Sequence, residues 1–179
     1  MLGDDPNNVR AFQALAEIVR RRAVSQVSDG DPLTAPADET EARRAADLAV
    51  WSLAEELAGN PRAWYPLIEL ARLSVGDDHE GTLRRLATAA ERDPSGAALA
   101  EGLAVLRDAE LPGEALGLGI GHWRPREHTP EVARQMVLAA LEAERPLEAK
   151  QHLRAFEDHT DARKTASLRA ELARMIDEA

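Results

Sequence analysis

The 179-residue sequence contains no cysteine. A disulfide framework, a thiolate nucleophile and a cysteine-ligated zinc site are therefore all excluded. Aromatic residues make up only 3% of the chain, whereas alanine accounts for about a fifth of it. Because alanine favours helices, while sheets are rich in the β-branched and aromatic residues that are scarce here, the composition predicts an all-α fold.

The sequence also lacks long apolar runs. Charged residues interrupt every apolar stretch before the roughly 18 residues that suggest a membrane-spanning helix. The opening residues, MLGDDPNN, have neither the basic start nor the apolar run of a secretory signal. We therefore expect a cytoplasmic protein that does not insert into membranes. Acidic residues outnumber basic ones by 32 to 22, for a net charge of −10, which disfavours nonspecific attraction to nucleic acid or anionic lipid.

A nine-residue helical phrase recurs along the chain. Its copies are FQALAEIVR from Phe12, WYPLIELAR from Trp64, LAEGLAVLR from Leu99, ARQMVLAAL from Ala133 and, more weakly, ASLRAELAR from Ala166. Successive copies begin 52, 35, 34 and 33 residues apart, so three of the four spacings are nearly constant. Positions one, four, five and eight are apolar or small, which places one stripe on a helix face. The sequence thus predicts a helical repeat.

A second amphipathic segment lies between successive copies, so the predicted repeating unit is a helical hairpin. Later second helices are expected at Pro112–Trp123 and Pro146–Phe156, each opening with a proline that fits the first helical turn. The long first spacing is explained by an inserted flexible loop at 27–38, with the helix resuming from Glu39 to Leu57. The terminal segment Thr160–Asp177 reads as an amphipathic capping helix. We expect one domain over residues 1–179, with hairpins at 7–58, 61–93, 95–124 and 129–158 and the cap at 160–178.

The copy that begins at Trp64 resembles the tetratricopeptide repeat family. The residues that match the family pattern are Trp64, Leu67, Ala71, Gly76, Ala89 and Pro94. Ile68 stands where the family usually has glycine, and the turn is about two residues longer. The resemblance implies a right-handed solenoid of about four hairpins, in which the first helices line a concave groove. Another kind of helical-hairpin solenoid is the alternative.

On that implied geometry, positions two, six and nine of the phrase face the groove. The candidate binding residues there are Gln13, Glu17, Arg20, Tyr65, Glu69, Arg72 and Arg107. Tyr65 is the aromatic anchor of this set, and Leu138 and Leu141 are expected as exposed aliphatic anchors. The alternative is that Glu17–Arg20 and Glu69–Arg72 are ion pairs on solvated helix faces, worth about 0.2–0.5 kcal/mol each.

Some tetratricopeptide proteins bind acidic chaperone tails through a clamp of lysine, asparagine and arginine. Here Tyr65 and Glu69 stand in the corresponding places, so an acidic tail would be repelled. A partner segment with basic or hydrogen-bonding side chains is the better expectation.

The segment GHWRPREH at residues 121–128 has an unusual composition. Trp123 is a candidate anchor, and Arg124 and Arg126 are candidate donors to a carboxylate or phosphate. The alternative is that Trp123 closes a hydrophobic gap at the end of a glycine-rich helix while both arginines are solvated.

Catalytic and cofactor motifs are missing from the sequence. The five histidines form no HExxH motif, there is no GxxxxGK[ST] or GxSxG motif, and GLGIG at 117–121 lacks a preceding strand. We therefore expect no enzyme activity, no cofactor and no metal. The predicted function is that of a noncatalytic scaffold or adaptor that binds a protein segment. The alternatives are a nucleic-acid-associated repeat, using Arg20–Arg22 or the Trp123 region, and, less favoured, a metal-dependent enzyme.

Overall fold

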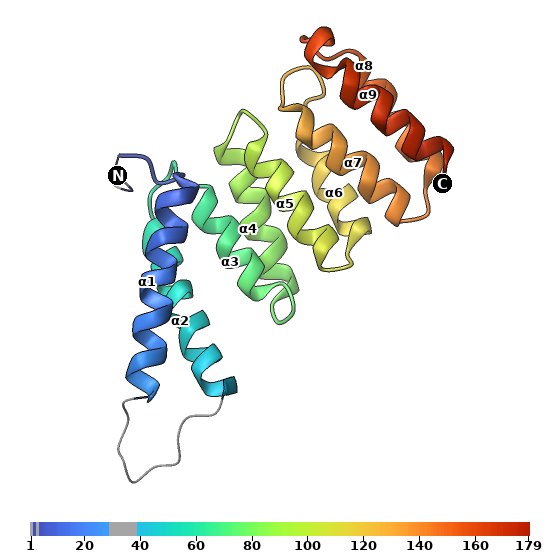
Figure 1. The fold of residues 1–179 in the computed structure, drawn as a ribbon. Helices are drawn as coiled ribbons and strands as arrows, with labels where there is room; N and C mark the ends of the chain where they lie inside the picture. Colours follow the sequence, from blue (N-terminus) through green and yellow to red (C-terminus); the bar gives the residue numbers. More distant parts are fainter. Residues whose placement is uncertain (1, 3, 29–38) are drawn as a thin grey trace.

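A computed structural model of the chain describes residue 2 and residues 4–28 and 39–179 (Figure 1). The described residues form helices and no strand. The helices are α1 (Val9–Ser28), α2 (Glu39–Ala58), α3 (Tyr65–Ser74), α4 (His79–Arg92), α5 (Ala97–Asp108), α6 (Pro112–His122), α7 (Pro130–Glu142), α8 (Pro146–Glu157) and α9 (Ala162–Asp177). The predicted all-α class is confirmed. None of these helices has the length and apolar character required to cross a membrane.

The helix ends follow simple local chemistry. Proline occupies the first position of α6, α7 and α8, where its missing N–H costs no hydrogen bond. Asp78 caps α4, because its Oδ1 accepts a 2.9 Å hydrogen bond from the backbone N–H of Gly81. Helix α2 begins at Glu39 as predicted, whereas α1 continues through Val27 and Ser28, which the sequence assigned to a loop. The other residues of that predicted loop, 29–38, lie outside the described residues.

The helices pack in chain order. Each helix from α1 to α9 contacts the next, and the odd-numbered helices α3, α5, α7 and α9 also contact one another in succession. Figure 1 shows the resulting row, which runs from α1 at one end to α8 and α9 at the other. The 20-residue helices α1 and α2 extend beyond the shorter helices beside them.

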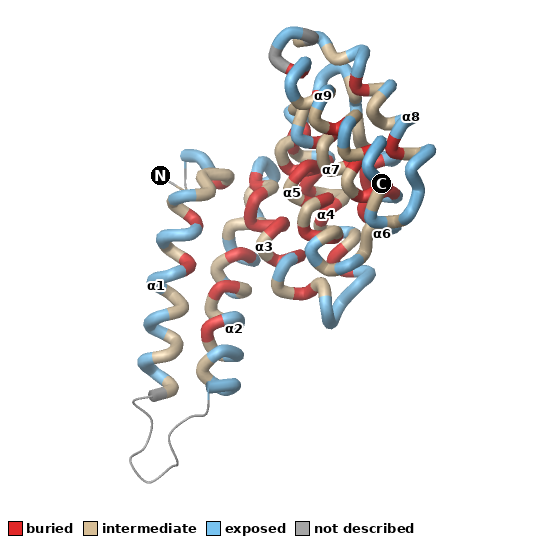
Figure 2. The backbone as a smooth tube through the Cα atoms, turned by 45° about the vertical axis from the view of Figure 1, so that its right-hand side comes forward, coloured by how far each residue is buried: buried red, intermediate tan, exposed pale blue. Residues whose placement is uncertain are grey.

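The hydrophobic core runs along this row rather than sitting at one centre. Figure 2 shows buried positions concentrated in the middle helices and sparse on α1 and α2. The largest fully buried side chains include Phe12, Tyr65, Ile68, Leu86, Leu99, Leu103, Leu106, Leu116, Met136, Phe156 and Leu172. Because they come from most of the helices, each helix is stabilised mainly by its neighbours.

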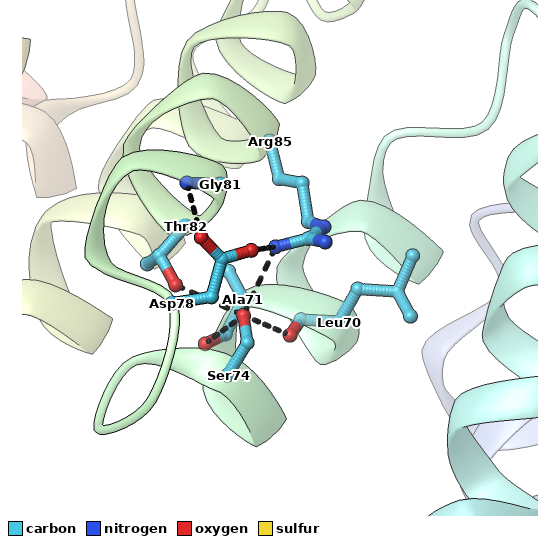
Figure 3. A network of polar contacts seen from close by, with 7 residues as sticks. All are labelled: Leu70, Ala71, Ser74, Asp78, Gly81, Thr82 and Arg85. Carbon is cyan, nitrogen blue, oxygen red and sulfur yellow. Dashed lines mark hydrogen bonds and ion pairs between the residues drawn. The ribbon is translucent and has the colours of Figure 1, made fainter.

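A polar network fastens the turn between α3 and α4 (Figure 3). The hydroxyls of the buried residues Ser74 and Thr82 lie 2.9 Å apart, joining the end of α3 to the start of α4. Arg85 Nη1 donates to Ser74 Oγ at 3.2 Å and to Asp78 Oδ2 at 3.1 Å. The same guanidinium lies 5.0 Å from the centre of the Trp51 ring on α2. The network therefore ties this hairpin to the preceding one.

Candidate binding surfaces

Polar side chains link the odd-numbered helices one after another. Gln13 Nε2 of α1 donates to Tyr65 Oη of α3 at 3.5 Å. Arg72 Nη2 of α3 donates to Glu101 Oε2 of α5 at 2.5 Å. Each bond joins residues more than 25 positions apart in sequence and crosses from one odd helix to the next.

The same linkage continues to the C-terminal helix. Arg107 of α5 contacts Gln135 and, through Nε at 2.8 Å and Nη2 at 2.5 Å, both carboxylate oxygens of Glu142 on α7. Arg134 of α7 contacts both oxygens of Glu171 on α9, at 2.6 and 3.1 Å. These two-pronged contacts fix orientation as well as charge. We call the whole set of bonds, from Gln13 to Glu171, the cross-helix ladder.

The ladder follows the sequence repeat. Arg72 and Arg107 both occupy position nine of the phrase, and their acceptors Glu101 and Gln135 both occupy position three of the next copy. One geometric relation between neighbouring copies therefore occurs twice. Both arginines are among the binding residues predicted from the sequence, whereas the two acceptors are not. The near-equal spacings of the two arginines and of the two acceptors are the signal that could have found them.

The local ion pairs are present only in part. Arg72 Nη1 contacts Glu69 Oε1 at 2.5 Å, as the ion-pair alternative expects. Glu17, in contrast, pairs with Arg21 at 2.6 Å rather than with Arg20. Arg72 thus bridges Glu69 on its own helix and Glu101 on α5. Its role is therefore more than an ion pair on one solvated helix face.

Two shallow hollows lie beside the ladder arginines. One has a volume of about 180 Å³ and is lined by Arg72, Val75, Val105, Asp108 and Ala109. The other has a volume of about 360 Å³ and is lined by Arg107, Glu110, Pro112 and Glu142. Ladder groups are therefore accessible from solvent on the odd-helix face.

Tyr65 is placed differently from the sequence expectation. Its side chain is only 1% exposed, and its ring packs edge-on against Phe12 with centroids 5.4 Å apart. Burial raises the pKa of its hydroxyl, and the neighbouring Glu69 raises it further. The ring therefore belongs to the core and is not an exposed anchor.

The aliphatic candidates are also less accessible than expected. Leu138 and Leu141 on α7 are half-buried, so the expectation that they are exposed is wrong. Among the described residues, the exposed large apolar side chains are instead Ile18, Leu48, Ile120 and Leu147. The repeat pattern missed them because it identifies the face that helices share and not the face that stays open.

The segment around Trp123 lies where three interhelical loops meet. The Trp123 ring is half-buried against the core and packs edge-on against His152, with centroids 5.8 Å apart. This packing favours the gap-closing alternative over an exposed anchor. Arg124 and Arg126 are exposed; Arg124 pairs with Glu127 at 3.7 Å, and the carbonyl of Arg126 accepts a hydrogen bond from Thr160.

His128 holds this loop junction together. It is 5% exposed, and its Nδ1 accepts the backbone N–H of Arg124 at 3.3 Å. The His159 ring lies 3.1 Å from the His128 carbonyl oxygen, through Nε2. The backbone N–H of Thr129 donates to the carbonyl of Ser95 in the loop before α5, at 2.8 Å. A cavity of about 310 Å³ beside it is lined by Ala90, Glu91, Asp93, Pro94, Gly121, His122, Trp123, Arg124 and His128.

The buried His128 and the half-buried His152 should make the fold sensitive to mild acid. Burial lowers the pKa of His128 and Arg124 lowers it further, while Asp93 and Glu127 act in the opposite direction; burial also lowers the pKa of His152. In the unfolded chain histidine pKa values are near 6.5. As the pH falls, the unfolded chain therefore binds more protons at these two histidines than the folded chain does. We therefore expect the urea midpoint to be highest above pH 7 and to fall between pH 7 and pH 5.

The His152→Phe variant tests that origin. Phenylalanine keeps a ring against Trp123 and removes both the titration and the His152 Nε2 atom, which is buried without a hydrogen-bond partner. The variant should therefore lose less stability between pH 7 and pH 5 than the parent. The control His79→Gln, at an exposed position in the first turn of α4, should leave the loss in place. An unchanged slope for His152→Phe would contradict the assignment.

Comparisons with known proteins give no match: no protein-family model, no curated protein and no solved structure matches this chain. Among the described residues, no group of three or more histidine, aspartate or glutamate side chains could hold a metal ion.

Proposed function

We propose that this protein is a noncatalytic interaction scaffold or adaptor that presents its odd-helix face to a segment of a protein partner. The observation that carries the proposal is the cross-helix ladder. It places paired carboxylates and guanidinium groups across α3, α5, α7 and α9, with one link between each successive pair of these helices. A row of oriented, solvent-accessible polar groups suits multipoint recognition of an extended segment.

The proposed architecture is a right-handed, tetratricopeptide-like solenoid of about four hairpins with α9 as its C-terminal cap. Two observations support it. Successive odd helices contact one another, and the contact from position nine to position three recurs between neighbouring copies. Such an array is stabilised by neighbour contacts, so its surface can stay fixed while a partner binds.

Charge on the odd-helix face favours a basic or hydrogen-bond-donating partner. The ladder arginines Arg72 and Arg107 are already bonded to carboxylates. Those carboxylates keep free lone pairs, and Glu101 and Glu142 are 45% and 41% exposed. Because the donors are engaged and the acceptors are not saturated, we propose that the partner supplies donors.

Charge reversal tests the proposal. The double variant Glu17→Arg/Glu69→Arg should reduce capture of the partner at least tenfold, because it turns two acceptors into cations on the proposed face. Partner proteins are captured from native extract by the parent protein and quantified by mass spectrometry. The double variant Glu56→Arg/Glu80→Arg is the control: its sites are exposed, lie on α2 and α4, and form no ion pair with a described residue.

The two variants carry the same change in net charge. If the control loses the same partners as the first variant, or if neither loses any, the odd-helix face is not the binding surface. Circular dichroism of each variant establishes that it remains helical, so that lost binding is not mistaken for unfolding.

A further inference from the structure

Helix α1 has a second apolar face that no described helix covers. Its inner face contributes the buried side chains Phe12 and Ala16. Its outer face carries four apolar side chains at the spacing of one helical stripe, namely Ala11, Ala14, Leu15 and Ile18. Ile18 is 47% exposed, although burial of a large aliphatic side chain is favourable.

A hollow of about 680 Å³ lies along this outer face. Its lining is apolar except for two residues, and consists of Leu2, Asn8, Arg10, Ala11, Ala14, Leu15 and Ile18. A continuous apolar hollow on a helix surface is the shape that accepts the apolar stripe of another helix. We call this surface the α1 groove.

Positive charge marks both ends of the α1 groove. Arg10 lines one end. Arg22 follows Ile18 by four residues, which places it on the same helix face one turn beyond the other end. Neither arginine forms an ion pair with any residue that the structure describes. With four arginines and one glutamate, α1 carries a net charge of +3 in a chain whose total is −10.

We propose that the α1 groove docks a helix of a partner protein that carries an apolar stripe with an acidic residue near each end. The stripe would bury Leu15 and Ile18, and the carboxylates would pair with Arg10 and Arg22. These arginines are 12 residues apart on α1, or about 18 Å at 1.5 Å per residue. The acidic residues of the partner are therefore expected about three helical turns apart.

The α1 helix of a second copy fits the α1 groove poorly. In an antiparallel pair of α1 helices centred on Ala16, Arg10 of each copy lies opposite Arg22 of the other. Both ends of the contact would then hold two like charges, which opposes association. An acidic helix removes that repulsion at both ends.

This inference does not depend on the function proposed for the odd-helix face. The ladder residues of α1 and α3, such as Gln13 and Tyr65, are not among the residues that line the groove. The groove variants Ile18→Glu and Arg22→Glu therefore leave the ladder side chains in place.

Two synthetic peptides provide the test. Each is an 18-residue helix-forming peptide with a leucine stripe and two charged residues twelve positions apart, glutamate in one and lysine in the other. Binding of the labelled peptides to the full chain is measured by fluorescence anisotropy at low and at moderate salt. We expect the glutamate peptide to bind at least tenfold more tightly at low salt and to lose part of that advantage as salt rises.

Variants assign the binding to the groove. Ile18→Glu should weaken binding of the glutamate peptide at least tenfold, and Arg22→Glu should narrow or invert the preference for glutamate over lysine. Matched controls are Leu48→Glu on α2, where the leucine is 66% exposed, and Arg154→Glu on the exposed surface of α8. Both controls should bind like the parent, and thermal melts check that all four variants fold.

Several outcomes would overturn the inference. Equal affinity for the two peptides, or equal weakening by Ile18→Glu and Leu48→Glu, would remove the acidic helix as the occupant. Sedimentation that shows a dimer dissolved by Ile18→Glu would assign the face to a second copy. Displacement of the peptide by single-stranded RNA, lost in Arg22→Glu, would assign it to nucleic acid instead.

Discussion

Replacing Gly96 with alanine is expected to lower the free energy of unfolding by about 2–4 kcal/mol. Two effects add at this position. Gly96 has a φ of 82°, in the left-handed region that alanine rarely adopts. A Cβ atom there would also lie 2.6 Å from Cγ and 2.7 Å from Cβ of His128.

The His128 ring cannot move aside cheaply. His128 is 5% exposed, and its ring accepts a hydrogen bond from the backbone N–H of Arg124. The backbone carbonyl of His128 also contacts the His159 ring. The added methyl group must therefore shift the loops before α5, α7 and α9 together. This coupling makes the substitution a test of the whole loop junction and not of one turn.

Urea unfolding measures the effect against a matched control. Gly76→Ala makes the same chemical change at a turn glycine whose φ is not positive and whose added Cβ would meet no atom within 4 Å. We expect it to be neutral or slightly stabilising. In a His128→Ala background, Gly96→Ala should cost less than in the parent, because the contacts with the ring are gone while the contact with Cβ of residue 128 and the backbone strain remain. A cost below 0.5 kcal/mol in the parent background would mean that the junction is loosely packed.

The sequence predicts the helices well because each one carries its own signals. The period of the apolar residues fixes the helical stretches, and Pro112 and Pro146 mark where α6 and α8 begin. The cross-helix ladder carries no such local signal. Arg72 and Glu101 are 29 positions apart, and their bond depends on how α3 and α5 are offset in space. The residue spacing within one helix does not specify that offset.

The faces of α1 and α3 show where pattern reading fails. In α3 the run Tyr65, Leu67, Ile68, Leu70 and Ala71 is buried on most sides of the helix, so periodicity cannot distinguish a groove face from a core face. In α1 the phrase groups Leu15 with Phe12 on the inner face, whereas Leu15 lines the outer hollow. A helix with two apolar faces looks the same in sequence whether one or both are covered.

Variants of Tyr65 test whether this side chain of α3 belongs to a binding groove or to the hydrophobic core. Tyr65→Ala is expected to lower the free energy of unfolding by about 3–5 kcal/mol, the usual cost of deleting a buried aromatic ring. The loss includes the edge-on contact with Phe12. Aromatic pairs of this kind contribute about 0.5–1.5 kcal/mol beyond the area that they bury.

Tyr65→Phe is the matched variant, because it keeps the ring and removes only the hydroxyl. That hydroxyl accepts a long hydrogen bond of 3.5 Å from Gln13 Nε2, so its loss should cost less than about 1 kcal/mol. Urea unfolding of both variants at pH 7 measures the difference, and partner capture by Tyr65→Phe measures any binding role of the hydroxyl. If Tyr65→Ala kept the parent stability and lost only binding, the ring would be accessible to a partner, and the packing of α1 on α3 through Phe12 would be wrong.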